Sequence, residues 1–185
     1  MDDASGEVVR IAPATSKVTA RSAVGDGPSD LAFTGGDVWV VNHRDRRLVR
    51  IDAVTNRAAT VAVLPGDAPE RIATLGGSLW VTGHGTDLLE VDPTNGRVVR
   101  VIEIGASGID VVAGAGALWV PARTAAAERR GFPTLDALRR VTPSTGAVRT
   151  VARARGRVDV HGLAATRDAV WLADNTGGTL YRVAG

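Results

Sequence analysis

One short motif occurs four times along the chain. It appears first as GGDVWVVN at residues 35–42 and returns at 76–83, 114–122 and 167–174. The central tryptophans are the only four in the sequence and lie 41, 39 and 52 residues apart: Trp39, Trp80, Trp119 and Trp171. Self-similarity with a period of about 40 residues indicates a repeat architecture, in which each unit buries its faces against its neighbours.

Each repeat contains four short apolar segments separated by turns. A segment rich in small apolar residues precedes each tryptophan strand, and a segment such as LVRID (48–52) follows it. Turns such as DPTNG place proline early and glycine late, which favours hairpins, and we expect Asp52 and Asp92 to bond the backbone of their own turns. The pattern predicts four antiparallel strands per repeat, named A to D from the inside outward, with structural tryptophans on strand B buried on both faces.

Four-stranded units of this length pack radially into a β-propeller, since the rungs of the alternative β-solenoid are shorter. We therefore predict an all-β protein, a single propeller domain of about four blades over residues 1–185. Its repeats are 1–26 (partial), 27–67, 68–106, 107–158 with a loop insertion at 122–136, and 159–185 (partial).

The expected strands number one more than four blades require, which leaves three alternatives. Strands from the two termini close a four-bladed ring, or the chain is a truncated arc of a larger propeller, or two chains complete one ring. An open arc exposes unpaired strand edges and apolar faces, so we expect a homodimer if the ring is open.

Composition and charge restrict the classes of partner. The formal net charge is only +2, but residues 121–157 hold nine arginines against Glu128 and Asp136, which predicts a basic patch on an otherwise acidic body. Because no stacking aromatics accompany these arginines, we do not expect a nucleic-acid partner. There is no cysteine, no signal peptide and no membrane span in the sequence, so we expect a soluble chain whose compartment stays undecided.

Loops that share one face of the propeller carry the candidate ligand-binding residues. Since strands alternate in direction, the D–A and B–C loops lie on the same face, and loops on a rigid scaffold often carry binding residues. Asp30, Arg71, Asp110 and His161 precede strand A, and six further candidates lie at or after the end of strand B: Asn42, His43, His84, Arg123, Asp174 and Asn175. We predict a face that binds a protein or a small molecule, with no catalytic residue, metal or cofactor; the alternative is a set of ordinary solvated loop residues.

The insertion in the third blade adds positive charge to this face. Its segments TAAAERR and FPTLDAL favour short helices, and we expect Phe132 and Leu135 to pack over the central channel. The arginines of the region favour an anionic ligand or an acidic partner, unless the insertion is simply a solvated loop: Arg129, Arg130, Arg139 and Arg140.

The combination of G-x-x-P-x-x-[LI]-A, G-G-x-[VL]-W-V and [LV]-x-R-[IV]-D-x-x-T resembles the bacterial YVTN-type propeller repeats, with similar repeats in virginiamycin B lyase and NHL-type propellers. The resemblance implies a non-catalytic binding module, often extracytoplasmic. A first alternative is a metal-dependent lyase, whose glutamate would correspond to Asn42, Gly83, Ala122 and Asp174. Of these only Asp174 is a carboxylate, and it would act with His84 or His161 and a divalent cation. A second alternative is a structural fragment of a larger sensor or receptor propeller.

Overall fold

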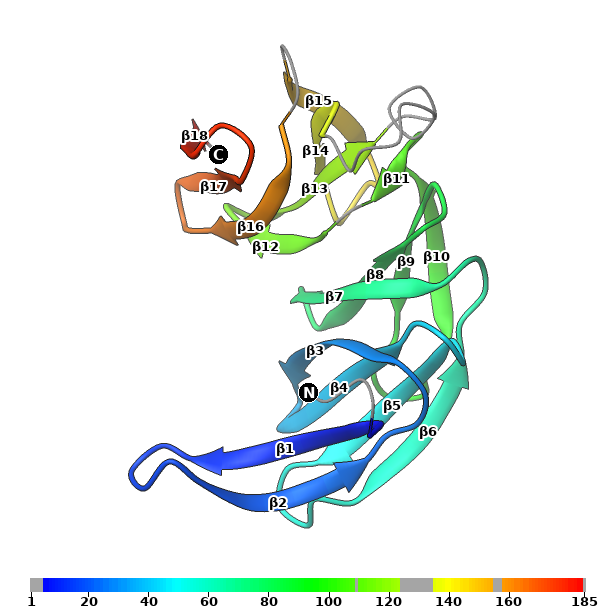
Figure 1. Ribbon diagram of the computed structural model, residues 1–185. Helices are drawn as coiled ribbons and strands as arrows, with labels where there is room; N and C mark the ends of the chain where they lie inside the picture. Colours follow the sequence, from blue (N-terminus) through cyan, green and yellow to red (C-terminus); the bar gives the residue numbers. More distant parts are fainter. Residues whose placement is uncertain (1–4, 109, 124–134, 155–157, 185) are drawn as a thin grey trace.

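The computed structural model describes residues 5–108, 110–123, 135–154 and 158–184, and every regular element in these ranges is a β-strand. The strands form antiparallel sheets placed side by side along an arc that is open on one side (Figure 1). This confirms the predicted all-β architecture of four-stranded antiparallel blades. In the part of the chain that is described, no helix is long and apolar enough to cross a membrane.

Five sheets follow one another in chain order. The N-terminal hairpin consists of β1 (Glu7–Ala12) and β2 (Lys17–Ala23). The first full blade consists of β3 (Pro28–Thr34), β4 (Asp37–Asn42), β5 (Arg47–Asp52) and β6 (Ala58–Val63). The second consists of β7 (Pro69–Leu75), β8 (Ser78–Gly83), β9 (Asp87–Val91) and β10 (Val98–Glu103).

In the third full blade, strand A is divided into β11 (Ser107–Gly108) and β12 (Val112–Gly114). The remaining strands of that blade are β13 (Ala117–Arg123), β14 (Ala137–Val141) and β15 (Val148–Arg153). The C-terminal sheet has three strands, β16 (Val160–Ala165), β17 (Ala169–Asp174) and β18 (Thr179–Ala184). Strands β3, β7, β12 and β16 line the concave side of the arc, so strand A is innermost, as predicted (Figure 1).

Buried clusters between successive blades form the core. Trp39 of the first blade packs with Ile72 and Leu79 of the second. Trp80 packs in the same way with Val111 and Leu118 of the third blade. Trp119 packs with Val170 of the C-terminal sheet. The first three tryptophans therefore contact the following blade, and Trp39, Trp80 and Trp119 are only 2%, 1% and 1% exposed.

The fourth tryptophan departs from the prediction. Trp171 is partly exposed, because no sheet of the described residues packs on the side that its ring faces. The guanidinium carbon of Arg182 lies 5.7 Å from the centre of its ring, a cation–π contact like the one that Arg140 makes with Trp119 at 5.8 Å.

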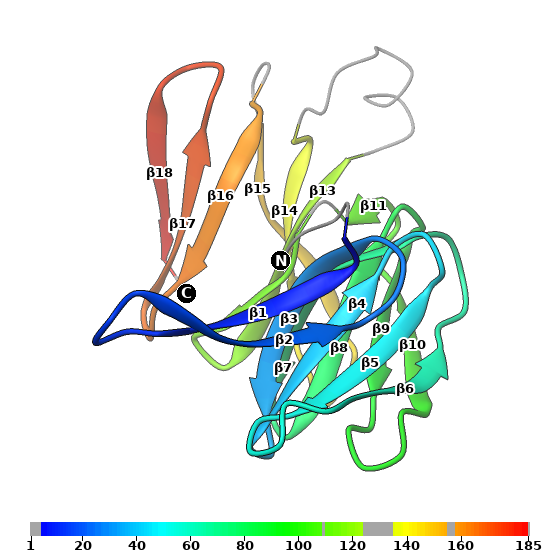
Figure 2. The same ribbon diagram turned by 60° about the horizontal axis from the view of Figure 1, so that its bottom comes forward.

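The arc does not close within the described residues. Strand β1 pairs only with β2, and β18 pairs only with β17, so each has an unpaired edge. Figure 2, turned by 60°, shows the hairpin β1–β2 lying across β3 and β4 at one end of the arc. The first of the three alternatives, a four-bladed ring closed by strands from both termini, is therefore wrong for the described residues.

The outer turns have the chemistry expected from the sequence. The Oδ1 atom of Asp52 accepts hydrogen bonds from the amides of Val54 and Thr55 at 2.9 and 2.8 Å. Asp92 accepts from Thr94 at 2.8 Å, and these bonds lower the pKa of both carboxyls. In the second of these turns Gly96 has φ of +71°, and a Cβ there would lie 2.4 Å from Cγ1 of Val61 in the preceding blade. Both aspartates are therefore turn residues.

Candidate functional site on the inner strands and the loop face

The D–A and B–C loops meet at the same end of each sheet, as predicted. The amide of Leu64 donates to the carbonyl of Arg46 at 2.9 Å, and Ile104 donates to Thr86 at 2.8 Å. In the C-terminal sheet Asn175, an exposed residue, donates its amide to Asp159 at 2.9 Å. Backbone hydrogen bonds thus fix the two kinds of loop relative to each other.

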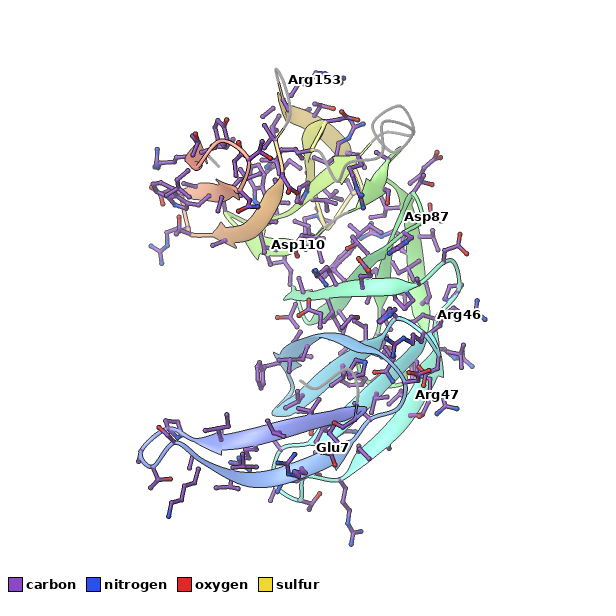
Figure 3. All side chains as sticks on the ribbon, viewed as in Figure 1. Glu7, Arg46, Arg47, Asp87, Asp110 and Arg153 are labelled. Atoms are coloured by element: carbon purple, nitrogen blue, oxygen red, sulfur yellow. The ribbon has the colours of Figure 1, made fainter. Side chains whose placement is uncertain are left out.

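A row of charged residues runs across the innermost strands of three blades. Asp30 lies in β3, Arg71 in β7, and Asp110 between β11 and β12, nine residues before the tryptophan of its own blade in every case. The three are half-buried. Figure 3 shows Asp110 on the concave side of the arc, between β12 and β7. We call this set the inner row.

Asp30 joins the first blade to the second. Its Oδ1 accepts from the amide of Leu31 at 2.8 Å, and its Oδ2 accepts from the amide of Ile72, in the next blade, at 2.9 Å. Burial raises the pKa of Asp30, and these two hydrogen bonds oppose the rise because they favour the ionised form.

Asp110 and Arg71 join the second blade to the third. The Nε of Arg71 lies 3.9 Å from Oδ1 of Asp110, which also accepts from the amide of Val111 at 2.7 Å. Burial raises the pKa of Asp110 to about 6; the Val111 hydrogen bond and Arg71 oppose this rise, and the charge of Asp30 adds to it. The side chains of Arg71 and Asp110 are 38% and 26% exposed, so a ligand on the concave side can reach them.

The fourth blade does not extend this row with His161. The strand register pairs Asp30 with Val41, Arg71 with Thr82 and Gly162 with Ala173, so Gly162 holds the equivalent position. His161 instead lies at the β-bulge, the position of Ser29 and Glu70 in the first two blades. Its side chain lies outside the described part of the structure.

Sequence reasoning missed Glu70. Its Oε1 lies 2.9 Å from Nε2 of His84, in the B–C loop of the same blade. This is an ion pair when the histidine is protonated, and His84 is exposed. The one available signal was alignment of the repeats one residue before the inner row, where Ser29, Glu70 and His161 coincide.

The residues that end strand B hold the loops in place. Asn42 is fully buried, and its Nδ2 donates to the carbonyl of Val24 at 2.8 Å. Asp174 is 5% exposed, and its Oδ1 accepts from the amides of Asp159 and Thr176 at 3.0 and 2.9 Å. These bonds lower the pKa of Asp174. Its carboxylate is therefore engaged with the backbone of its own loops.

His43 and His84 are not brought together. Nδ1 of His43 lies 2.9 Å from the carbonyl of Gly27 in its own blade, whereas His84 belongs to the second blade. Arg123 ends β13, and its Nε is buried without a hydrogen-bond partner among the described residues. The described residues contain no group of three or more acidic or histidine side chains that could hold a metal ion.

Of the four arginines predicted to make the insertion basic, only Arg139 and Arg140 are described by the structure. Arg129 and Arg130 lie outside the described residues, as does Phe132. Arg139 and Arg140 belong to β14, where alternation places them on opposite faces of the sheet: Arg139 donates to Oγ1 of Thr150, and Arg140 covers Trp119. Neither belongs to a loop. Leu135, expected over the channel, is instead buried in the cluster between the third blade and the C-terminal sheet.

A shallow groove opens on the same loop face beside the second blade. It is lined by residues of both loop types, including Pro65 and Gly85, and by the strand-end residues Pro69 and Gly83. Asp67 and Asp87 add carboxylates to its lining, and Pro69 and Gly83 are the chain neighbours of Glu70 and His84. The groove therefore lies at the same loop end as the inner row but extends outward to β9 and β10, and Figure 3 shows Asp87 on the outer side of the arc.

No family model matches this chain, and a search of curated proteins found no match. Solved structures do match. Hydrazine synthase from Kuenenia stuttgartiensis is 16% identical with a TM-score of 0.72, over 98% of this chain and 61% of that chain. Virginiamycin B lyase from Staphylococcus aureus, solved with quinupristin, is 18% identical with a TM-score of 0.71, over 98% and 64%. The WD40 domain of Neurospora crassa Pan2 is 11% identical with a TM-score of 0.74, over 96% and 54%.

The chain thus spans between 54% and 64% of the length of these structures. Identities this low establish the fold alone. They confirm the resemblance read from the repeats: the chain has a β-propeller fold similar to that of virginiamycin B lyase.

Proposed function

We propose that this protein is a non-catalytic binding module that recognises a protein segment or a small molecule on the face carrying the D–A and B–C loops. The inner row supports the proposal most directly. It places three half-buried charges, each from a different blade, on or beside the innermost strands of the arc, with Asp110 on the concave side (Figure 3). Loops and strand ends on a rigid repeat scaffold are where propellers and other repeat folds carry binding residues.

Arg71 is the central contact of this site. Its 3.9 Å separation from Asp110 is long for a charge-assisted hydrogen bond, so a ligand carboxylate can take over the guanidinium at a small cost. Asp30 and Asp110 flank it with negative charge, which favours a ligand that combines an acidic group with a basic one, as a peptide does. The groove beside the second blade would take an adjoining apolar part of such a ligand.

The lyase alternative depends on Asp174, the one carboxylate at the corresponding positions. That side chain is buried and accepts backbone hydrogen bonds. His84 pairs with Glu70 and lies in a different blade from Asp174. These residues do not fit a shared magnesium site, so we derive no reaction through a metal.

The test is selection from a random-peptide phage library on the immobilised protein, followed by titration of enriched peptides. We expect Arg71→Gln and Asp110→Asn each to weaken binding about tenfold, since each removes one charged contact. Arg153→Gln is the matched control, because Arg153 is exposed on β15 at the outer side of the arc (Figure 3). Enriched peptides that bind both inner-row variants as well as the native protein would refute this site.

A further inference from the structure

The two ends of the arc expose the two halves of one kind of interface. Inside the molecule, each blade presents a tryptophan face that packs on the back face of the next blade. The C-terminal sheet has a tryptophan face on which no sheet of the described residues packs. The first full blade has a back face that the hairpin β1–β2 covers only in part.

A leucine that is buried in the full blades is exposed in the C-terminal sheet. Leu180 pairs with Ala173, Leu48 with Val41, and Leu138 with Pro121. Each partner lies two residues after the tryptophan of its sheet, so the three leucines are at equivalent positions. Leu48 and Leu138 are 0% and 1% exposed, whereas Leu180 is 62% exposed. Together with Trp171 and Ala173, it forms an uncovered apolar face, which we call the Trp171 face.

The other end has the complementary surface. Leu31 and Val38 of the first blade occupy the positions that Ile72 and Leu79 hold in the second blade. Ile72 and Leu79 are the residues on which Trp39 packs. Leu31 and Val38 instead line a groove of about 820 Å³ beside Phe33 and Ile11, which are 67% and 54% exposed. Strand β1 borders this groove with an unpaired edge in the described structure. We call this surface the Phe33 groove.

We propose that a second copy of this chain covers these surfaces, with the Trp171 face of one copy packed into the Phe33 groove of the other. The occupant follows from the match: the groove displays residues at the positions on which a tryptophan face packs three times within this molecule, and the same chain carries an uncovered tryptophan face. Two different surfaces then meet at each contact, so the association is head-to-tail.

The experiment is light scattering coupled to size exclusion over about a hundredfold range of protein concentration. We expect the mass to rise above the 19.1 kDa of one chain as concentration increases. Leu180→Glu and Phe33→Glu should each abolish this rise, whereas Val99→Glu, at a position on β10 that is 57% exposed, should not. Far-UV circular dichroism checks that the variants stay folded.

Mixing the two variants tests the head-to-tail geometry. The Leu180→Glu chain keeps its groove and the Phe33→Glu chain keeps its Trp171 face, so an equimolar mixture should form a one-to-one dimer although neither variant associates alone. In the native protein, acrylamide quenching of Trp171, the most exposed of the four tryptophans, should fall as concentration rises. A native protein that is monomeric throughout, association that ignores both substitutions, or a mixture that stays monomeric would each overturn the proposal.

Discussion

At the scale of single residues, the inner row shows that side chains at one repeated position do different work. Asp30 crosses to a backbone amide of the next blade, and Arg71 crosses to a side chain. Neither contact could be predicted from one repeat, because each depends on how two blades lie against each other. The β-bulge at the start of strand A could not be predicted either, because no turn residue marks it in the sequence. It places Glu70 and His161 one residue before the inner row, so that His161 does not align with Arg71.

Asp110 makes folding stability depend on pH. Its pKa is about 6 in the folded protein against 3.8 unfolded, so the folded state binds the proton more tightly. Stability is therefore lost as pH rises from about 4 to about 6, with an upper bound on the order of 3 kcal/mol. Asp110→Asn cannot ionise and keeps an acceptor for the Val111 amide, so it should gain stability relative to the native protein as pH rises through this range.

Urea unfolding of both proteins at several pH values measures the difference. Glu103→Gln, at an exposed position of β10, is the control and should show no such trend. A stability difference between Asp110→Asn and the native protein that stays constant from pH 4 to pH 7 would contradict the assignment.

At the scale of elements, strand B was predicted best. Its apolar residues and the tight turn before it are local features, and the structure confirmed their position in every blade. The burial of its tryptophan was predicted for all four copies but holds for three, because burial depends on a neighbour that the local sequence does not encode. The helix expected at TAAAERR lies outside the described residues, and so does the first part of the one expected at FPTLDAL. The rest of FPTLDAL is not helical, because Leu135 and Asp136 have no regular structure and Ala137 and Leu138 begin β14.

This difference between copies predicts unequal effects of the same substitution. Trp80→Ala should lower the free energy of unfolding by about 3–5 kcal/mol, since Trp80 is 1% exposed and the ring leaves a cavity between two blades. Trp171→Ala should cost about 1 kcal/mol or less at low protein concentration, because the ring is covered on one side only. Denaturant unfolding monitored by circular dichroism gives both values, and equal losses would show that the two faces are equally packed.

At the scale of the whole molecule, stability is distributed along the arc according to how many neighbours each sheet has. In repeat folds the total approximates a sum of unit and nearest-neighbour terms. The second full blade is packed on both faces, whereas the C-terminal sheet is packed on one. Closure of the ring could not be predicted, since the same local pattern serves an open arc and a closed ring.

Hydrogen exchange should follow this distribution. At low protein concentration, amides of β8 should exchange at least about tenfold more slowly than those of β17, because the end sheet opens without disturbing two interfaces. Mass spectrometry after proteolysis resolves the two strands. Equal protection of β8 and β17 in a sample verified as monomeric would mean that the arc unfolds as a single unit.

The pairing of β13 with β14 has a consequence for how such a chain can change. Trp119 faces Arg140 across this pair in the same way that Trp80 faces Glu90 across β8 and β9, although the first connection spans residues 124–136 and the second only 84–86. The sheet thus keeps its alignment whatever the length of the B–C connection. New segments can enter at this corner without disturbing the neighbouring blades, which makes it the natural place to graft a foreign recognition loop.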